Sequence, residues 1–158
     1  MAFTGSAVCN SFKTEVLQGI HNFNTSGGNT FKLAMYTNSA STTKSTTVYA
    51  APADGTADPT STNEITSTGT NYTTGGNSLT SVTPALSSDT AVCDFSDTNW
   101  TSATITARGA IIYNSTATPD NEQAVCVLDF GGDKTCTGGT FTIQFPLPND
   151  SAGIIRLA

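Results

Sequence analysis

The segment TSATITARGAIIYN (Thr101–Asn114) decides the fold class. Threonine and isoleucine recur along it, and their branched side chains favour strands. We therefore predict two strand segments, Thr101–Arg108 and Ala110–Asn114. Gly109 stands between them and predicts a bulge or a bend rather than a turn.

Four more predicted strands surround this segment, and turn-forming residues separate most of them. Residues Phe130–Lys134 (FGGDK) predict a hairpin tip, because glycine readily supplies a positive φ. Short, regularly spaced strands are typical of an antiparallel β-sandwich or barrel, so we expect a mainly-β fold of this kind. The four strands are Ala91–Phe95, Gln123–Phe130, Thr140–Phe145 and Ile154–Leu157.

The N-terminal part predicts one α-helix, Ser11–Phe23, because apolar side chains recur within it at helical spacing. Ser11 is a candidate N-cap, and Glu15 lies near the first turn, where its charge suits the helix dipole. Beyond the helix, Thr30–Thr37 alternates in polarity and predicts a strand with one buried face. Thr46–Ala50 is a candidate for a further strand.

The chain changes character between residues 51 and 88, where large apolar residues become few. So few anchors cannot offset the ordering entropy of a long segment. The segment is therefore either a long loop lying on the domain or an arm ordered by a neighbouring subunit. Loops this long are unusual inside compact domains, which favours the arm. We expect one β-rich domain over residues 1–158, with 51–88 as its extended loop or arm.

The charge pattern argues against two classes of partner. Only 11 % of the residues are charged and the net charge is −6. The Lys and Arg residues are scattered singly, whereas nucleic-acid and anionic-membrane surfaces are bound by basic clusters. No apolar run approaches the roughly 18 residues of a membrane span, and the N-terminus lacks a secretory signal. We expect a protein made in a cytoplasm whose neutral surface packs against other proteins.

Cytoplasmic thiols usually stay reduced, so we expect free cysteines. Cys93 and Cys126 lie in apolar, alternating contexts and are predicted to be buried thiols. Cys126 and Cys136 flank the predicted hairpin tip, which leaves a cross-strand disulfide between them open. The chain has no Cys-x-x-Cys pair and its one histidine is His21, so neither a zinc site nor a cofactor is expected.

Motifs that resemble catalytic ones do not add up to an active site. Residues 41–44 (STTK), 96–98 (SDT) and 134–136 (KTC) follow the order of the penicillin-recognising enzymes, but the last two are imperfect and the first lies in a predicted loop. We expect His21 to be structural and the protein to be non-enzymatic. Four aspartates could meet across a sheet to hold Ca²⁺, but strand ends and turns are the favoured interpretation. They are Asp94, Asp97, Asp129 and Asp133.

Four residues are candidate structural or interface anchors. A lone tryptophan such as Trp100 usually anchors a core or an interface, and Tyr72 and Tyr113 lie among predicted strand and loop segments that need such anchors. Arg108 is expected to pair with Asp94 or Asp97 across the sheet.

Several segments along the chain match a known family of proteins. They are residues 2–5, 11–15, 21–23, 30–37, Tyr72 with 75–76, Trp100 with 104–114, and 128–131. In these segments the chain resembles a family of small virion structural proteins of tailed phages, seen often in marine and cyanobacterial viruses. The resemblance implies a capsid decoration or cement protein on the virion surface, bound to the major capsid protein or another virion protein and assembled as a homotrimer. It brings no catalytic residue and no cofactor.

Two alternatives remain open at this stage. The first is a neck, tail or fibre-attachment protein of the same virion. The second is a virion-borne carbohydrate-binding module that stacks sugars on Trp100 or on exposed tyrosines, namely Tyr36, Tyr49 and Tyr72.

Overall fold

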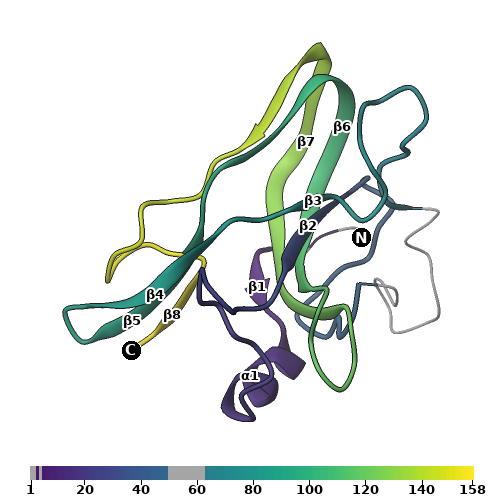
Figure 1. Cartoon of the computed structure of the whole chain (residues 1–158). Helices are drawn as coiled ribbons and strands as arrows, with labels where there is room; N and C mark the ends of the chain where they lie inside the picture. Colours follow the sequence, from purple (N-terminus) through teal and green to yellow (C-terminus); the bar gives the residue numbers. More distant parts are fainter. Residues whose placement is uncertain (1–2, 4, 50–62) are drawn as a thin grey trace.

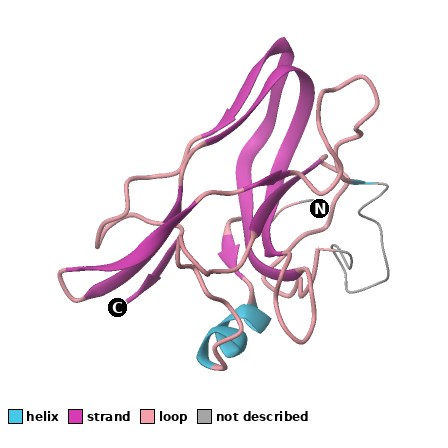
Figure 2. Ribbon diagram, in the orientation of Figure 1, coloured by secondary structure: helices cyan, strands magenta, loops and turns pink. Residues whose placement is uncertain are grey.

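The structure, a computed structural model, describes residues 3, 5–49 and 63–158. It consists mainly of antiparallel strands (Figure 1), with one short helix near the N-terminus (Figure 2). One sheet has the order β1-β7-β6-β2-β3 and the other the order β4-β5-β8. The mainly-β antiparallel prediction is confirmed, and two open sheets favour the sandwich over the barrel. The elements are β1 (Ala7–Val8), α1 (Asn10–Leu17), β2 (Phe31–Tyr36), β3 (Asn77–Ser78), β4 (Ser81–Ser87), β5 (Thr90–Phe95), β6 (Thr98–Asn114), β7 (Gln123–Ile143) and β8 (Ile155–Leu157).

A long two-stranded ribbon, β6 with β7, is the centre of the fold. The two strands pair along their whole lengths, from Thr98 opposite Ile143 to Asn114 opposite Gln123. In Figure 1 the ribbon rises from the small sheet, curls over at the top and descends again. The pairing is irregular near this bend, where Ser102 has a φ of 49°. Such bulges bend a strand and increase its twist, which lets the ribbon curl.

The predicted hairpin tip at Phe130–Lys134 is wrong, because these residues lie within the single strand β7. Gly131 does have a positive φ, 74°, and its N–H donates to Asp129 Oδ1 at 2.9 Å. The ladder with β6 then resumes at Lys134, opposite Ala107. A bulge needs the same left-handed glycine as a turn, so the two look alike in sequence.

The two strand segments predicted on either side of Gly109 form one strand, β6. The pairing with β7 shifts between Ala107 and Gly109, as the predicted bulge or bend requires. The strand prediction for Thr30–Thr37 is confirmed by β2, but its single buried face is wrong. All of β2 except half-buried Lys32 is buried, because β6 and β3 flank the strand.

The helix is shorter than predicted. It ends at Leu17, because Gly19 takes a φ of 74°. The N-cap is Cys9, not Ser11, and no acidic residue lies in the first turn. The chain beyond the helix folds back instead, which brings the Phe23 ring onto the Phe31 ring at a centroid distance of 4.3 Å.

The described part of the segment 51–88 is not an extended arm. Residues 51–62 lie outside the described part of the chain. In the described part, Glu64 forms an isolated backbone β-bridge with Tyr36, β3 belongs to the large sheet and β4 belongs to the small sheet. Ile65 and Tyr72 are buried in the core. The described part of Thr46–Ala50 likewise contributes only one isolated bridge, from Val48 to Gln123.

Replacing Gly76 by alanine tests the junction between β2 and β3. Gly76 has a φ of 72°, and a Cβ there would lie 1.7 Å from the Leu33 carbonyl oxygen. We expect Gly76→Ala to lower the free energy of unfolding by at least about 2 kcal/mol in urea titrations. Gly132→Ala is the control, since its Cβ would meet nothing within 4 Å. Equal unfolding midpoints for the two variants would contradict this account.

Candidate functional site

Tyr72 and Tyr113, two predicted anchors, belong to a buried network around Glu64. The Glu64 carboxylate accepts hydrogen bonds from Tyr49 Oη (2.7 Å), Tyr72 Oη (2.6 Å) and the Gly75 N–H (2.7 Å). Tyr113 Oη donates to the Gly75 carbonyl (2.8 Å), and its ring stacks on Tyr49 at 4.4 Å. Burial raises the pKa of the three phenols, so they remain donors. The network therefore fixes residues 63–76 on the domain.

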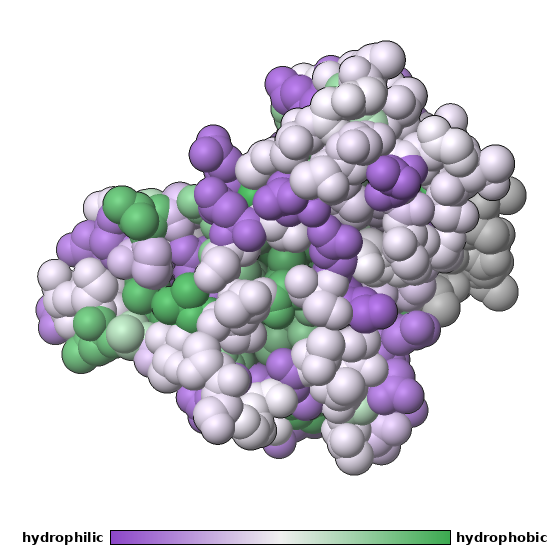
Figure 3. All heavy atoms as spheres, turned by 45° about the horizontal axis from the view of Figure 1, so that its top comes forward, coloured by the Kyte–Doolittle hydropathy of each residue, from purple (hydrophilic) through white to green (hydrophobic). Residues whose placement is uncertain are grey.

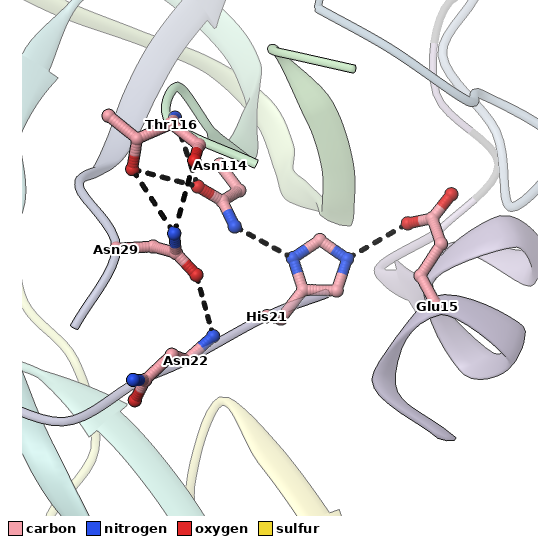
Figure 4. A network of polar contacts seen from close by, with 6 residues as sticks. All are labelled: Glu15, His21, Asn22, Asn29, Asn114 and Thr116. Carbon is pink, nitrogen blue, oxygen red and sulfur yellow. Dashed lines mark hydrogen bonds and ion pairs between the residues drawn. The ribbon is translucent and has the colours of Figure 1, made fainter. Parts of the chain in front are cut away.

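A second buried network is centred on His21 (Figure 4). Asn114 Oδ1 accepts from the Thr116 N–H, so Asn114 Nδ2 donates to His21 Nδ1 at 3.1 Å. His21 Nε2 then carries the proton and faces Glu15 Oε2 at 2.9 Å. Burial lowers the pKa of His21, although Glu15 opposes this effect. The neutral imidazole makes two hydrogen bonds and so joins the helix to β6.

The side chains of Trp100 and Arg108 make contacts within the protein. Trp100 is buried and packs against the Tyr72 and Phe141 rings. Arg108 Nη1 lies 3.1 Å from Asp129 Oδ1, so the predicted salt bridge forms, but with Asp129 rather than Asp94 or Asp97. Asp129 pairs with Gly109 across the ribbon, so the register of β6 and β7 places its carboxylate beside Arg108.

Three of the four aromatic residues named for carbohydrate stacking are not exposed as that hypothesis expects. Tyr36, Tyr72 and Trp100 are all buried, and half-buried Tyr49 is stacked against Tyr113. The three buried rings offer no open aromatic face to a sugar. These aromatic rings stabilise the core instead.

The cysteines are free, as predicted. The disulfide that was left open between Cys126 and Cys136 is excluded, because both lie on β7, ten positions apart on one strand. Burial raises the pKa of Cys9 and Cys93 to about 12, which disfavours a reactive thiolate. Over residues 3, 5–49 and 63–158, no three His, Cys, Asp or Glu side chains gather as a metal site would require.

The small sheet, β4-β5-β8, exposes a group of apolar side chains, whereas Leu17 of α1 and Leu147 in the loop before β8 are exposed elsewhere on the described surface. Leu86, Ala91 and Leu157 lie opposite one another across its three strands. Leu86 is 73 % exposed and Leu157 58 % exposed. Figure 3 shows hydrophobic residues gathered at this end of the molecule, on the left.

An apolar groove adjoins this row. It has a volume of about 160 Å³ and lies between α1 and the small sheet. Phe12 and Val16 of the helix line one side, and Pro84, Ala91 and Ile155 line the sheet side. An exposed apolar row beside an apolar groove is typical of a surface that binds another protein.

The opposite face of the small sheet holds a second hollow of about 230 Å³. Strand register places Val82 opposite Asp94 and Ala85 opposite Val92 on this face. Pro148, from the loop that precedes β8, also lines it. Asp94 is buried here, which raises the pKa of its carboxyl, while the Phe95 N–H opposes the rise.

No protein-family model, no curated protein and no solved structure matches this chain. In the described ranges, no helix is both long enough and apolar enough to cross a membrane.

The Glu64 network predicts different costs for two tyrosine substitutions. Tyr72 Oη donates to Glu64 and also accepts from the Met35 N–H at 3.0 Å. Tyr72→Phe therefore removes one hydrogen-bond partner from the Glu64 carboxylate and one from the Met35 N–H, and is expected to lower the free energy of unfolding by about 2–4 kcal/mol. Tyr49→Phe removes one bond and is expected to cost about 1–2 kcal/mol. Urea unfolding of both variants measures this, and the reverse order would disprove it.

The His21 network predicts that stability falls with acid. The folded pKa of His21 lies below its usual 6.5, so the unfolded chain takes up the proton first as the pH falls. The free energy of unfolding should therefore decrease below about pH 6.5, by up to about 1.4 kcal/mol per pH unit. His21→Gln removes this titration, and its unfolding free energy should change less between pH 7.5 and pH 5. Identical pH profiles would refute the assignment.

Proposed function

We propose that this chain is a non-enzymatic structural protein of a tailed-phage particle, and specifically a capsid decoration or cement protein. Its partner would be the major capsid protein at the junctions between subunits, with the chain itself assembled as a homotrimer. The resemblance carried by Trp100 with residues 104–114, and by residues 128–131, supports the virion assignment. The observation that carries the docking role is the exposed row Leu86, Ala91 and Leu157 beside the apolar groove.

Exposed leucines at this end of the molecule are a source of binding free energy. Burying a leucine side chain contributes roughly 1.5–3 kcal/mol, and Leu86 and Leu157 are both largely uncovered. A contact of modest strength is sufficient for a decoration protein, because symmetry repeats it over the whole shell.

The composition of the rest of the surface suits the same role. Charged residues make up 11 % of the chain, and much of the exposed surface consists of Thr, Ser and Asn side chains. Hydroxyl and amide groups lose less on desolvation than unpaired charges do when a neighbouring protein covers them. Such a surface can be packed closely against a capsid without a matching set of counter-charges.

The test is attachment to the particle. We expect Leu86→Ser combined with Leu157→Ser to reduce the affinity for particles that lack the protein by at least about tenfold. The matched control is Thr106→Ala with Thr135→Ala, an exposed pair on the ribbon whose Oγ atoms lie 3.1 Å apart. Co-sedimentation with particles, followed by mass spectrometry of the pellet, gives both the affinity and the copy number.

The outcomes separate the virion roles. A copy number in proportion to the major capsid protein supports decoration, whereas a few copies at one vertex would replace it by a neck, tail or fibre-attachment role. Unchanged attachment of the double leucine variant would show that the small sheet is not the docking surface.

A further inference from the structure

Asp94 is a buried carboxylate without a counter-ion. It is only 2 % exposed, and its one hydrogen bond is from the N–H of the next residue, Phe95, to Oδ1 at 2.8 Å. In the described residues the basic side chains that lie within 4 Å of a carboxylate are the His21 imidazole, beside Glu15, and the Arg108 guanidinium, beside Asp129, so no cation of the chain neutralises Asp94 there.

The hollow beside Asp94 has the character of a site for a basic side chain. Its volume is about 230 Å³, and apolar walls surround the single carboxylate, formed by Val82, Ala85, Leu86, Val92 and Pro148. Lysine and arginine combine an aliphatic stem with a charged head, and they bury the stem on apolar surface. The stem would contact these walls while the head reaches Asp94.

The electrostatics favour an incoming cation. Burial raises the pKa of Asp94, and the neighbouring charge of Asp97 raises it further, so the anion is costly when it has no partner. A bound cation would offset that cost. Arg156 lies on the same face of the sheet, opposite Val92, but its Nη1 donates to the Asp150 carbonyl at 2.9 Å.

We propose that this hollow binds a lysine or arginine side chain presented by the protein that docks on the small sheet. The inference rests on the proposed docking function and adds the chemistry of the partner. The net charge of −6 would favour the approach of a basic segment. The apolar groove on one face and the acidic hollow on the other would then recognise an apolar and a basic part of the partner.

The first experiment uses the free protein and two small probes. Titration with N-acetyl-lysine methylamide should give saturable NMR shifts at the amides of Val82, Val92 and Asp94. N-acetyl-norleucine methylamide, which lacks the ammonium group, should give none. Asp94→Asn keeps the acceptor for the Phe95 N–H but removes the charge, so it should abolish the shifts and raise the melting temperature by a few degrees.

Matched variants make the result specific. Asp97→Asn removes one negative charge, as Asp94→Asn does, but leaves the hollow intact, so binding should be retained. Ala85→Leu fills the hollow from an exposed strand position and should abolish binding even if Asp94→Asn does not fold. Equal binding of the norleucine probe, or equal loss in Asp97→Asn, would overturn the proposal.

Particle attachment separates this inference from the function on which it rests. Asp94→Asn should weaken co-sedimentation, and charge reversal of a basic residue on the partner should do the same. If the wild type attaches and Asp94→Asn attaches equally well, the basic-side-chain site is wrong while the docking role stands. If the lysine probe binds but the wild type does not attach to particles, the proposed function is wrong.

Discussion

The backbone pairing of β6 with β7 is the constraint on which the rest of the fold depends. β1 and β2 are hydrogen-bonded to the two outer edges of this ribbon, and β5 leads directly into β6. The curl of the ribbon brings Trp100 and Phe141 into the same core as β2. One hairpin therefore sets the positions of elements that lie far apart in the sequence, including the small sheet with its exposed leucines.

Buried polar groups replace missing apolar anchors in the segments that the ribbon does not hold directly. Residues 63–76 have few large apolar side chains, yet Glu64 gathers three donors and fixes the segment on the core. His21 does the same for the chain that follows α1. A fully satisfied buried network of this kind restricts the chain to one arrangement, which apolar contacts specify less strictly.

Five of the strands could be predicted at least in part from the sequence, whereas β1, β3 and β4 were not predicted and the pairing partners could not be. Alternation of side-chain character along the chain correctly indicated β2, β5, β6 and β8, because side-chain periodicity is a local property. The Gly131 bulge was mistaken for a turn, since both need a positive φ. The pairing of Arg108 with Asp129, and the position of Asp94 opposite Val82, depend on the register between two paired strands, which the periodicity of a single strand does not give. The small number of apolar anchors in residues 63–76 did not predict the Glu64 network. The nearby Tyr49 and Tyr72, whose hydroxyl groups need buried acceptors, were the sequence feature that pointed to it.

The route by which the small sheet joins the ribbon has a mechanical consequence. β5 continues into β6 through only two residues, Ser96 and Asp97. Tension applied to β5 is therefore passed directly to β6, whose ladder with β7 extends from Thr98 opposite Ile143 to Asn114 opposite Gln123. β8 pairs with β5 over three residues near the end of the chain, so tension on the C-terminus would peel those bonds apart in succession. A neighbour that binds β5 would be connected to the longest ladder of the fold, whereas one that binds β8 would be connected through three paired residues.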